Sequence, residues 1–160
     1  MSRTGQANCR LIDRFKRAIA RSKRNESLLA ICFLDLDAFK PVNDTFGHEM
    51  GDKVLIEVAK RITENVREID TVSRQGGDEF VILLNDIEST VQCEKTLKRI
   101  HQSLAQAFII DGQTLNLSAS SGVTLSPYDK GDSDTLLRHA DDAMYQAKAS
   151  GKNQYRLFIE

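Results

Sequence analysis

Four acidic side chains could perform chemistry together if the fold brought them to one place. Asp35 and Asp37 end a continuous apolar run, and Asp78 and Glu79 lie between the glycine pair Gly76-Gly77 and a second apolar run. Clustered carboxylates raise one another's pKa unless a cation offsets their charge. A hard divalent cation such as Mg²⁺ is held by one or two carboxylates, carbonyl oxygens and phosphates. The acids therefore indicate a site for a divalent cation and a phosphate-bearing ligand.

Each acid also has a purely structural interpretation. Asp78 suits a tight turn, and Asp35 suits the end of a strand, so either residue alone says little about function. The two positions together favour the functional interpretation, because they flank a glycine pair that lets the backbone approach a ligand closely.

Hydrophobic periodicity predicts the elements that would position these acids. Apolar residues at helical spacing predict helices over residues 9–25, about 54–66, 89–104 and 132–151. Continuous or alternating apolar runs predict strands over residues 28–34, 71–74, 79–84, 115–125 and 155–159. Gly122 is expected to mark a β-bulge, and His101 and His139 are expected on helix surfaces.

The predicted order of elements is a helix, then β-α-β-β-α-β, then a helix and a strand. The middle six elements form the ferredoxin-like arrangement of the α+β class. Its first helix returns the chain, so the strand before the glycine pair runs parallel to the first strand. The end of the first strand, at Asp35, and the turn over residues 76–78 must then share one edge of the sheet. Topology alone would bring together acids more than forty residues apart.

Composition limits the class of protein. The chain has 160 residues, of which 41% are hydrophobic and 28% charged, and its net charge is −1. These values are typical of one globular domain, and the apolar runs are shorter than the ~20 residues of a bilayer span. Residues 1–10 lack the apolar core of a secretory signal. Three widely spaced cysteines disfavour a disulfide scaffold or zinc site and fit a reducing cytosol. We expect neither a nucleic-acid partner nor a membrane partner for this segment.

Three segments carry a more specific signal. The sequence Gly76-Gly77-Asp78-Glu79-Phe80 is one, residues 33–48 (FLDLDAFKPVNDTFGH) with Gly51-Asp52 are the second, and residues 140–153 (ADDAMYQAKASGKN) are the third. Over nearly its whole length the chain resembles the GGDEF family, the catalytic domain of diguanylate cyclases. The resemblance implies the fold of nucleotidyl cyclase and palm-type domains, in which helices flank an antiparallel ferredoxin-like sheet, with an added C-terminal helix and strand. It also implies condensation of two GTP molecules into cyclic di-GMP, with release of two pyrophosphates.

The resemblance implies a metal site and a reacting centre. Mg²⁺, or Mn²⁺ in its place, would be held by the carboxylates of Asp35 and Asp78 and by the Leu36 carbonyl. Glu79 would be a further ligand or the base near the attacking 3′-hydroxyl. Catalytic roles would fall to Asp78, Glu79 and Lys40.

The resemblance also implies the contacts with GTP. Asn43 and Asp52 would bind guanine, because a carboxylate accepts from the N1–H and N2–H pair that adenine lacks. The substrate-binding set comprises Asn43, Asp52, Phe39, Lys40, Gly76, Gly77, Lys148 and Lys152. In it Phe39 and Lys40 would offer backbone N–H groups to the phosphates, and the last two lysines would neutralise phosphate charge. Those lysines could instead simply favour the negative end of the last helix.

An Arg-x-x-Asp pattern, Arg67 and Asp70, precedes the glycine pair. By itself it is a weak pattern, often a surface ion pair, but the resemblance implies an inhibitory site for the product cyclic di-GMP. Lys95, Lys98 and Arg99 on the next predicted helix are candidates to complete it. Because each site would hold one GTP, the double condensation requires a two-fold homodimer.

The sequence departs from the family pattern in two places. Residues 3–10 resemble the family's Leu-Thr-Gly-Leu-x-Asn-Arg opening but differ at Arg3, Gln6 and Cys9, and Lys152 stands where the family more often has arginine. We expect one GGDEF domain over residues 1–160, a fragment of a longer multidomain signalling protein. It would be cytoplasmic, or the cytosolic part of a membrane-anchored protein.

Two other functions stay open at this point. One is a catalytically silent module that binds GTP or cyclic di-GMP to regulate an adjacent domain. The other is an RNA-binding ferredoxin-like module, which is disfavoured because the predicted sheet lacks the aromatic residues on which such modules stack bases.

Overall fold

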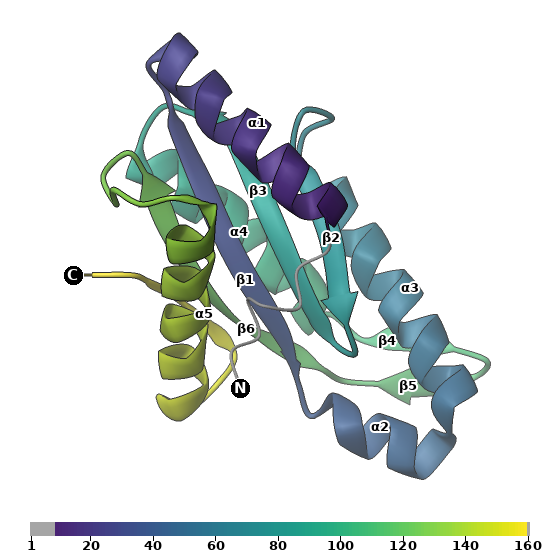
Figure 1. The fold of residues 1–160 in the computed structure, drawn as a ribbon. Coiled ribbons are helices and arrows are strands. Elements are labelled where there is room, and N and C mark those ends of the chain that lie inside the picture. The colour runs from purple at the N-terminus through teal and green to yellow at the C-terminus, as the bar shows by residue number, and fades with distance from the viewer. Residues whose placement is uncertain (1–8, 160) are drawn as a thin grey trace.

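A five-stranded sheet with strand order β2-β3-β1-β6-β7 forms the centre of the computed structural model, which describes residues 9–159 (Figure 1). The elements are α1 (Cys9–Asn25), β1 (Leu28–Asp37), α2 (Phe39–Phe46), α3 (His48–Glu64), β2 (Thr71–Gly76), β3 (Glu79–Ile87), α4 (Thr90–Ala105), β4 (Phe108–Ile110), β5 (Gln113–Leu115), β6 (Ser118–Ser126), α5 (Ser133–Ala149) and β7 (Gln154–Leu157). Strand β1 pairs antiparallel with β3 and β6, whereas β7 joins β6 in parallel.

The sheet is covered on both faces. Helices α1 and α5 cover one face, where Ile31 and Phe33 of β1 contribute to one apolar cluster. Helices α3 and α4 pack on the other face, where Cys32 and Leu34 belong to a second cluster. All ten residues of β1 are consequently buried, which explains why this strand reads as a continuous apolar run rather than an alternating one.

The predicted fold class is confirmed. Strands β1, β2, β3 and β6, with the helices between them, follow the β-α-β-β-α-β order, and α5 and β7 are the added C-terminal elements. The predicted first helix has the bounds that the structure shows, residues 9–25. No helix within residues 9–159 combines the length and apolar character needed to cross a bilayer.

Two elements were not predicted. Helix α2 has only eight residues, and its sequence FKPVNDTF contains poor helix formers. It is anchored by the burial of Phe39 and Val42 and lies against α3 across Gly47, whose φ of +90° suits glycine. The short β4–β5 hairpin forms a separate two-stranded sheet, so the predicted strand over residues 115–125 is divided at its start.

The predicted bulge at Gly122 is wrong. Gly122 pairs in regular register with Phe33 of β1. A Cβ atom at this position would lie 2.1 Å from the Ala140 carbonyl oxygen and 2.1 Å from the Met144 nitrogen. Glycine is therefore needed here because α5 packs directly on the backbone of β6.

Candidate active site at one edge of the sheet

The end of β1 meets the β2–β3 turn, as the topology predicts. Asp35 is the register partner of Glu79, and the Leu36 N–H donates to the Asp78 carbonyl oxygen at 3.2 Å. Asp35 is 6% exposed, while Asp78 is only partly buried. The predicted metal ligands thus come together at one edge of the sheet.

The glycine pair forms a tight turn with a bulge beside it. Gly76 and Gly77 have φ angles of +132° and +50°, and the β2–β3 register shifts between Arg74 and Gly76. A guanidinium N–H of Arg74 donates to the Gly77 carbonyl oxygen at 2.7 Å. Both glycines are exposed. The sequence analysis did not predict that Arg74 stabilises this turn. Its position two residues before the glycine pair was the available signal.

Lys148 brings a positive charge into the acidic edge from α5. Its Nζ lies 3.2 Å from the Leu36 carbonyl oxygen, 3.3 Å from Asp37 Oδ1 and 3.6 Å from Asp35 Oδ2. This is a cation among the oxygens expected to bind a metal. The structure therefore places Lys148 within the site, where its charge offsets the acids.

Asp37 has a different role from its neighbour two residues earlier. It is 4% exposed and accepts hydrogen bonds from the Ser118 and Ser120 hydroxyls, both at 2.7 Å, and from the Asn153 N–H at 3.0 Å. Burial alone would raise the pKa of Asp37, but these hydrogen bonds and the Lys148 charge outweigh burial and lower it. Asp37 therefore ties together β1, β6 and the turn after α5, a structural role that sequence reasoning did not find.

The residues at this edge fit a magnesium ion that shares its ligands with a substrate. Within residues 9–159 no three acidic, histidine or cysteine side chains form a group able to hold a metal alone. The set is two carboxylates, Asp35 and Asp78, with the Leu36 carbonyl. Mg²⁺ is commonly bound by one or two carboxylates plus substrate phosphates and water, so this donor set suits it.

The packing of α2 on α3 brings Asn43 next to Gly51, the residue that precedes Asp52. The Asn43 side chain packs against Gly51, where an added Cβ would meet Asn43 Oδ1 at 1.8 Å, and Asp52 follows directly. Asp52 also lines a cavity of about 570 Å³ between α3 and β2, with Arg74 on its far side. This volume is within the range of small-molecule sites.

The other residues predicted to contact phosphate lie at the start of α2 and in the turn after α5. Phe39 and Lys40 begin α2 after Ala38, whose φ is +59°, and the N–H groups of a first helical turn have no partner within the helix. Lys40 and Lys152 are exposed. Lys152 lies in the turn after α5, held there by its own N–H, which donates to the Ala147 carbonyl at 3.0 Å.

Arg67 and Asp70 contact each other and line a cavity that contains none of the acids of the sheet edge. Asp70 accepts from the backbone N–H groups of Arg67 and Asn85, each at 2.8 Å, and the Arg67 guanidinium donates to the Asn85 carbonyl. A small cavity of about 150 Å³ is lined by both residues and by Lys95 and Arg99. Lys98, the third candidate from the sequence, is not among its lining residues.

The histidine expectation is wrong for both residues. His101 Nε2 lies 2.7 Å from the Ser121 hydroxyl, and burial lowers the pKa of His101 from 6.5 to about 4, opposed only by the negative charge of Asp37. His139 Nδ1 lies 2.7 Å from Asp129 Oδ2. Both rings point toward the sheet, where each has a polar partner: Ser121 on β6 for His101, and Asp129 just after β6 for His139.

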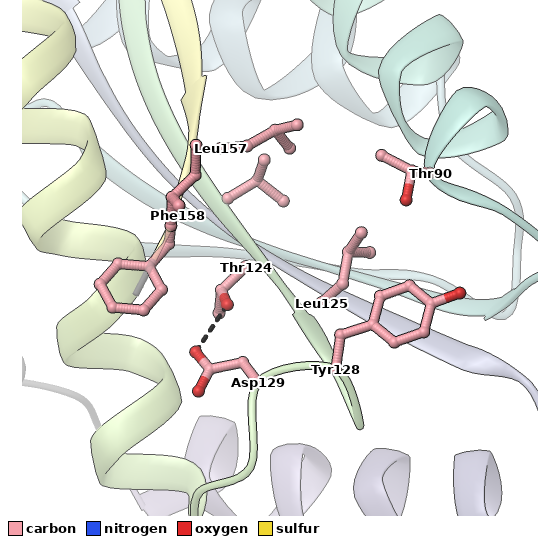
Figure 2. Close-up of a pocket in the computed structure, with 9 residues that line it drawn as sticks. Thr90, Thr124, Leu125, Tyr128, Asp129, Leu157 and Phe158 are labelled. Atoms are coloured by element: carbon pink, nitrogen blue, oxygen red, sulfur yellow. Dashed lines mark hydrogen bonds between the residues drawn. The ribbon is translucent and has the colours of Figure 1, made fainter.

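A further cavity, of about 330 Å³, lies at the opposite end of β6 from Asp37. Figure 2 shows its lining, including Leu125, Tyr128 and Leu157, and the hydrogen bond of 2.6 Å that Thr124 donates to Asp129. Because it contains none of the predicted site residues, it is not part of the candidate active site.

The ferredoxin-like sheet with its added C-terminal helix and strand defines a class of fold, that of nucleotidyl cyclase and palm-type domains. Comparison with known families makes the assignment specific. The family model "Diguanylate cyclase, GGDEF domain" matches residues 3–154. The chain belongs to this family.

The relatives are longer proteins. The chain is 44% identical over 151 residues to the bifunctional diguanylate cyclase/cyclic di-GMP phosphodiesterase MucR of Pseudomonas aeruginosa, covering 92% of this chain and 22% of MucR. It is 40% identical over 130 residues to the cyclic di-GMP phosphodiesterase NbdA of the same organism, covering 81% of this chain and 16% of NbdA. The crystal structure of the GGDEF domain of P. aeruginosa TpbB matches with a TM-score of 0.90 and 35% identity over 96% of both chains.

Proposed function

We propose that this chain is a diguanylate cyclase that condenses two GTP molecules into cyclic di-GMP and two pyrophosphates. The observation that carries the proposal is the convergence of Asp35, Asp78 and the Leu36 carbonyl at one edge of the sheet, with Lys148 beside them. Family membership supports it, as does the similarity to MucR, which is named as a bifunctional diguanylate cyclase/cyclic di-GMP phosphodiesterase.

The chain's own residues would bind and orient GTP. Asn43 packs against Gly51, which precedes Asp52, and Asp52 lines the α3–β2 cavity, where the two side chains would bind guanine. Lys148, with the exposed Lys152, would offset the β- and γ-phosphate charge. The first N–H groups of α2, at Phe39 and Lys40, would donate to phosphate oxygens, as helix N-termini commonly do. Exposed Gly76 and Gly77 would leave room for the nucleotide.

The reaction joins the 3′-oxygen of one GTP to the α-phosphorus of the other and breaks the bond to the β-phosphate. A divalent cation bound by Asp35, Leu36 and Asp78, with Mg²⁺ or Mn²⁺ as the candidates, would supply charge stabilisation at the transferring phosphoryl group. Glu79 is the register partner of Asp35 and would accept the 3′-hydroxyl proton or orient that hydroxyl. The product closes only when this transfer occurs twice, so two protomers must face each other around a two-fold axis.

Product inhibition would act at the separate Arg67 site. Three cations line this cavity, namely Arg67, Lys95 and Arg99. They would bind a phosphate or a guanine edge. Asp70 is largely occupied in fixing the backbone at Arg67 and Asn85. We infer that Asp70 shapes the site while the basic residues bind the product.

The test is GTP turnover by the purified chain with Mg²⁺, with products resolved by chromatography. The proposal expects cyclic di-GMP and pyrophosphate from the unmodified chain, and no product from Asp78→Ala. Glu64→Ala is the matched control, because Glu64 is an exposed acid at the end of α3 and belongs to neither the predicted metal site nor the predicted GTP site. Unchanged product formation by Asp78→Ala would contradict the metal assignment. Raising the protein concentration should increase turnover more than linearly if the dimer is limiting.

A catalytically silent GTP-binding or cyclic di-GMP-binding module is the second candidate. It is favoured by the similarity to NbdA, which is named only as a cyclic di-GMP phosphodiesterase. The two functions separate in one experiment. A silent module would bind GTP in calorimetry yet form no cyclic di-GMP at any protein concentration, whereas a cyclase would do both.

A further inference from the structure

A line of arginines runs along α1 beside its buried face. The arginines are Arg10, Arg14, Arg17, Arg21 and Arg24. Alternating steps of four and three residues keep side chains on one side of a helix, so these five form one ridge. The buried residues Leu11, Phe15, Ala18 and Ser22 each follow an arginine by one position. In a chain whose net charge is −1, the ridge is a local concentration of positive charge.

The two arginines nearest the start of the helix are available to a ligand. Arg17 pairs with Asp13 at 3.2 Å, and Arg21 pairs with Asp86 at 2.9 Å. Arg10 and Arg14 are exposed, and neither makes an ion pair with a carboxylate of the part of the chain that the structure describes.

Arg10 and Arg14 line a groove against β2. The groove has a volume of about 260 Å³, and residues 71–74 of β2 form its other wall. Figure 1 shows the first turns of α1 lying next to β2. Arg74 also lines the groove, but it pairs in register with Phe80 of the cluster on the α3 side of the sheet, and its guanidinium donates to the Gly77 carbonyl. Two cations, Arg10 and Arg14, therefore lie beside a short strand.

The outer edge of β2 is open. β2 is the terminal strand of the sheet, and no strand within residues 9–159 pairs with its outer side. An edge strand presents backbone N–H and C=O groups that can pair with another extended chain. The free edge and the arginines are independent observations, and both indicate an extended ligand with negative charge.

We propose that the groove between α1 and β2 binds an extended acidic segment of a partner protein. The segment pairs with the outer edge of β2 by backbone hydrogen bonds, and its carboxylates face Arg10 and Arg14. Alternate side chains of an extended peptide point to the same side, about 7 Å apart. A segment with an acid at every second position therefore matches the groove.

Other occupants fit less well. A second copy pairing β2 with β2 would bring identical arginines together, which is unfavourable. Residues 1–8 of this chain contain no acidic side chain, so they do not supply the carboxylates. A lipid surface or a nucleic acid duplex could meet the arginines, but neither has a backbone that can extend a β-sheet.

The test begins with a fluorescent peptide of alternating glutamate and valine or threonine, titrated with the full chain in fluorescence anisotropy at about 150 mM salt. Binding is expected, and at least tenfold weaker binding is expected for two altered peptides. One has lysine in place of glutamate. The other keeps the glutamates but has proline at the positions between them, which removes backbone donors.

A matched pair of variants then locates the site. Arg10→Glu/Arg14→Glu reverses two charges that line the groove, and we expect at least tenfold weaker binding. Lys16→Glu/Lys23→Glu makes the same change in net charge on another side of α1, away from the groove lining, and should weaken binding less than twofold. All four residues are exposed, and circular dichroism melting curves verify that both variants fold.

Three results would overturn the proposal. The first is equal weakening by the two double variants, which would indicate only a general charge effect. The second is equal affinity for the proline-containing peptide, which would exclude pairing with β2. The third is binding of phosphatidylserine vesicles or duplex DNA as tightly as the peptide and with the same dependence on Arg10 and Arg14.

Discussion

Asp37 and Asp78 lie at the same edge of the sheet, but only the carboxylate of Asp37 is hydrogen-bonded within the protein. Asp37 is buried and accepts from two hydroxyls and one backbone N–H, with Lys148 alongside. The Asp78 side chain sits on an exposed glycine turn and makes no hydrogen bond or ion pair within residues 9–159, although its backbone carbonyl binds Leu36.

This difference separates structural acids from acids available to a ligand. A carboxylate whose lone pairs are already filled stabilises the fold and has little capacity left for a metal. A carboxylate held in place by its backbone, with its side chain free of protein donors, can bind a cation without losing a structural contact. The predictions below test this distinction, beginning with the largest effect.

The first prediction concerns Asp78. Asp78→Asn should reduce GTP turnover by about a thousandfold or more, because the amide removes a charged ligand from the site. The free energy of unfolding should change by less than about 0.5 kcal/mol, because the Asp78 side chain is only partly buried and makes no hydrogen bond or ion pair within residues 9–159. Turnover assays and urea denaturation measure the two quantities. A large loss of stability would show that Asp78 is structural like Asp37.

The opposite result is expected for Asp37. Asp37→Asn should lower the free energy of unfolding by about 2–4 kcal/mol, because an amide cannot accept from all the donors that surround the carboxylate and leaves Lys148 with less negative charge. Urea denaturation measures this, with exposed Asp44→Asn on α2 as the control. A change equal to that of the control would remove the contrast with Asp78.

His101 gives the comparison a pH dependence. The pKa of His101 is about 4 in the folded protein and 6.5 ordinarily. As the pH falls, the unfolded chain therefore binds a proton at this residue before the folded protein does. Its contribution to stability is complete above pH 6.5 and is lost as the pH falls to about 4, by roughly 2–3 kcal/mol. Asp37 acts at lower pH, since its lowered pKa preserves its contribution until the carboxylate is protonated.

The measurement for His101 is urea denaturation at several pH values between 7 and 4. His101→Gln keeps a partner for Ser121 but does not titrate, so its stability should decline less over this range. Parallel curves for the two proteins would assign the acid sensitivity to other groups.

The smallest predicted effect concerns Arg67 and extends the comparison to the second site. Arg67→Ala should raise the cyclic di-GMP concentration that halves turnover by about tenfold, the loss of one charged hydrogen-bond partner. Lys98→Ala is the control, because Lys98 is exposed on α4 but does not line the cavity. Equal inhibition of wild type and Arg67→Ala would discard the site.

Much of the architecture followed from local patterns. The apolar run of β1 and the helical spacing of residues 9–25 are clear sequence signals. The first arises because β1 is buried on both faces, and the second because α1 buries one face. The order of elements then predicted that Asp35 and the 76–78 turn would meet, and the register of Asp35 with Glu79 confirms it. Helix α2 was missed because its stability depends on two buried anchors, Phe39 and Val42, rather than on helix propensity.

The sequence by itself determined the fold class, the family and the edge at which the acids meet, because periodicity and the order of strands fix these. Only the tertiary structure decided which acid is structural and which is available. The donors of Asp37 come from Ser118, Ser120, Lys148 and Asn153, at least eighty residues away along the chain. The groove formed by Arg10, Arg14 and β2 is likewise a product of packing. Hydrogen-bond partners and grooves arise from contacts between distant segments, and local sequence patterns do not predict such contacts.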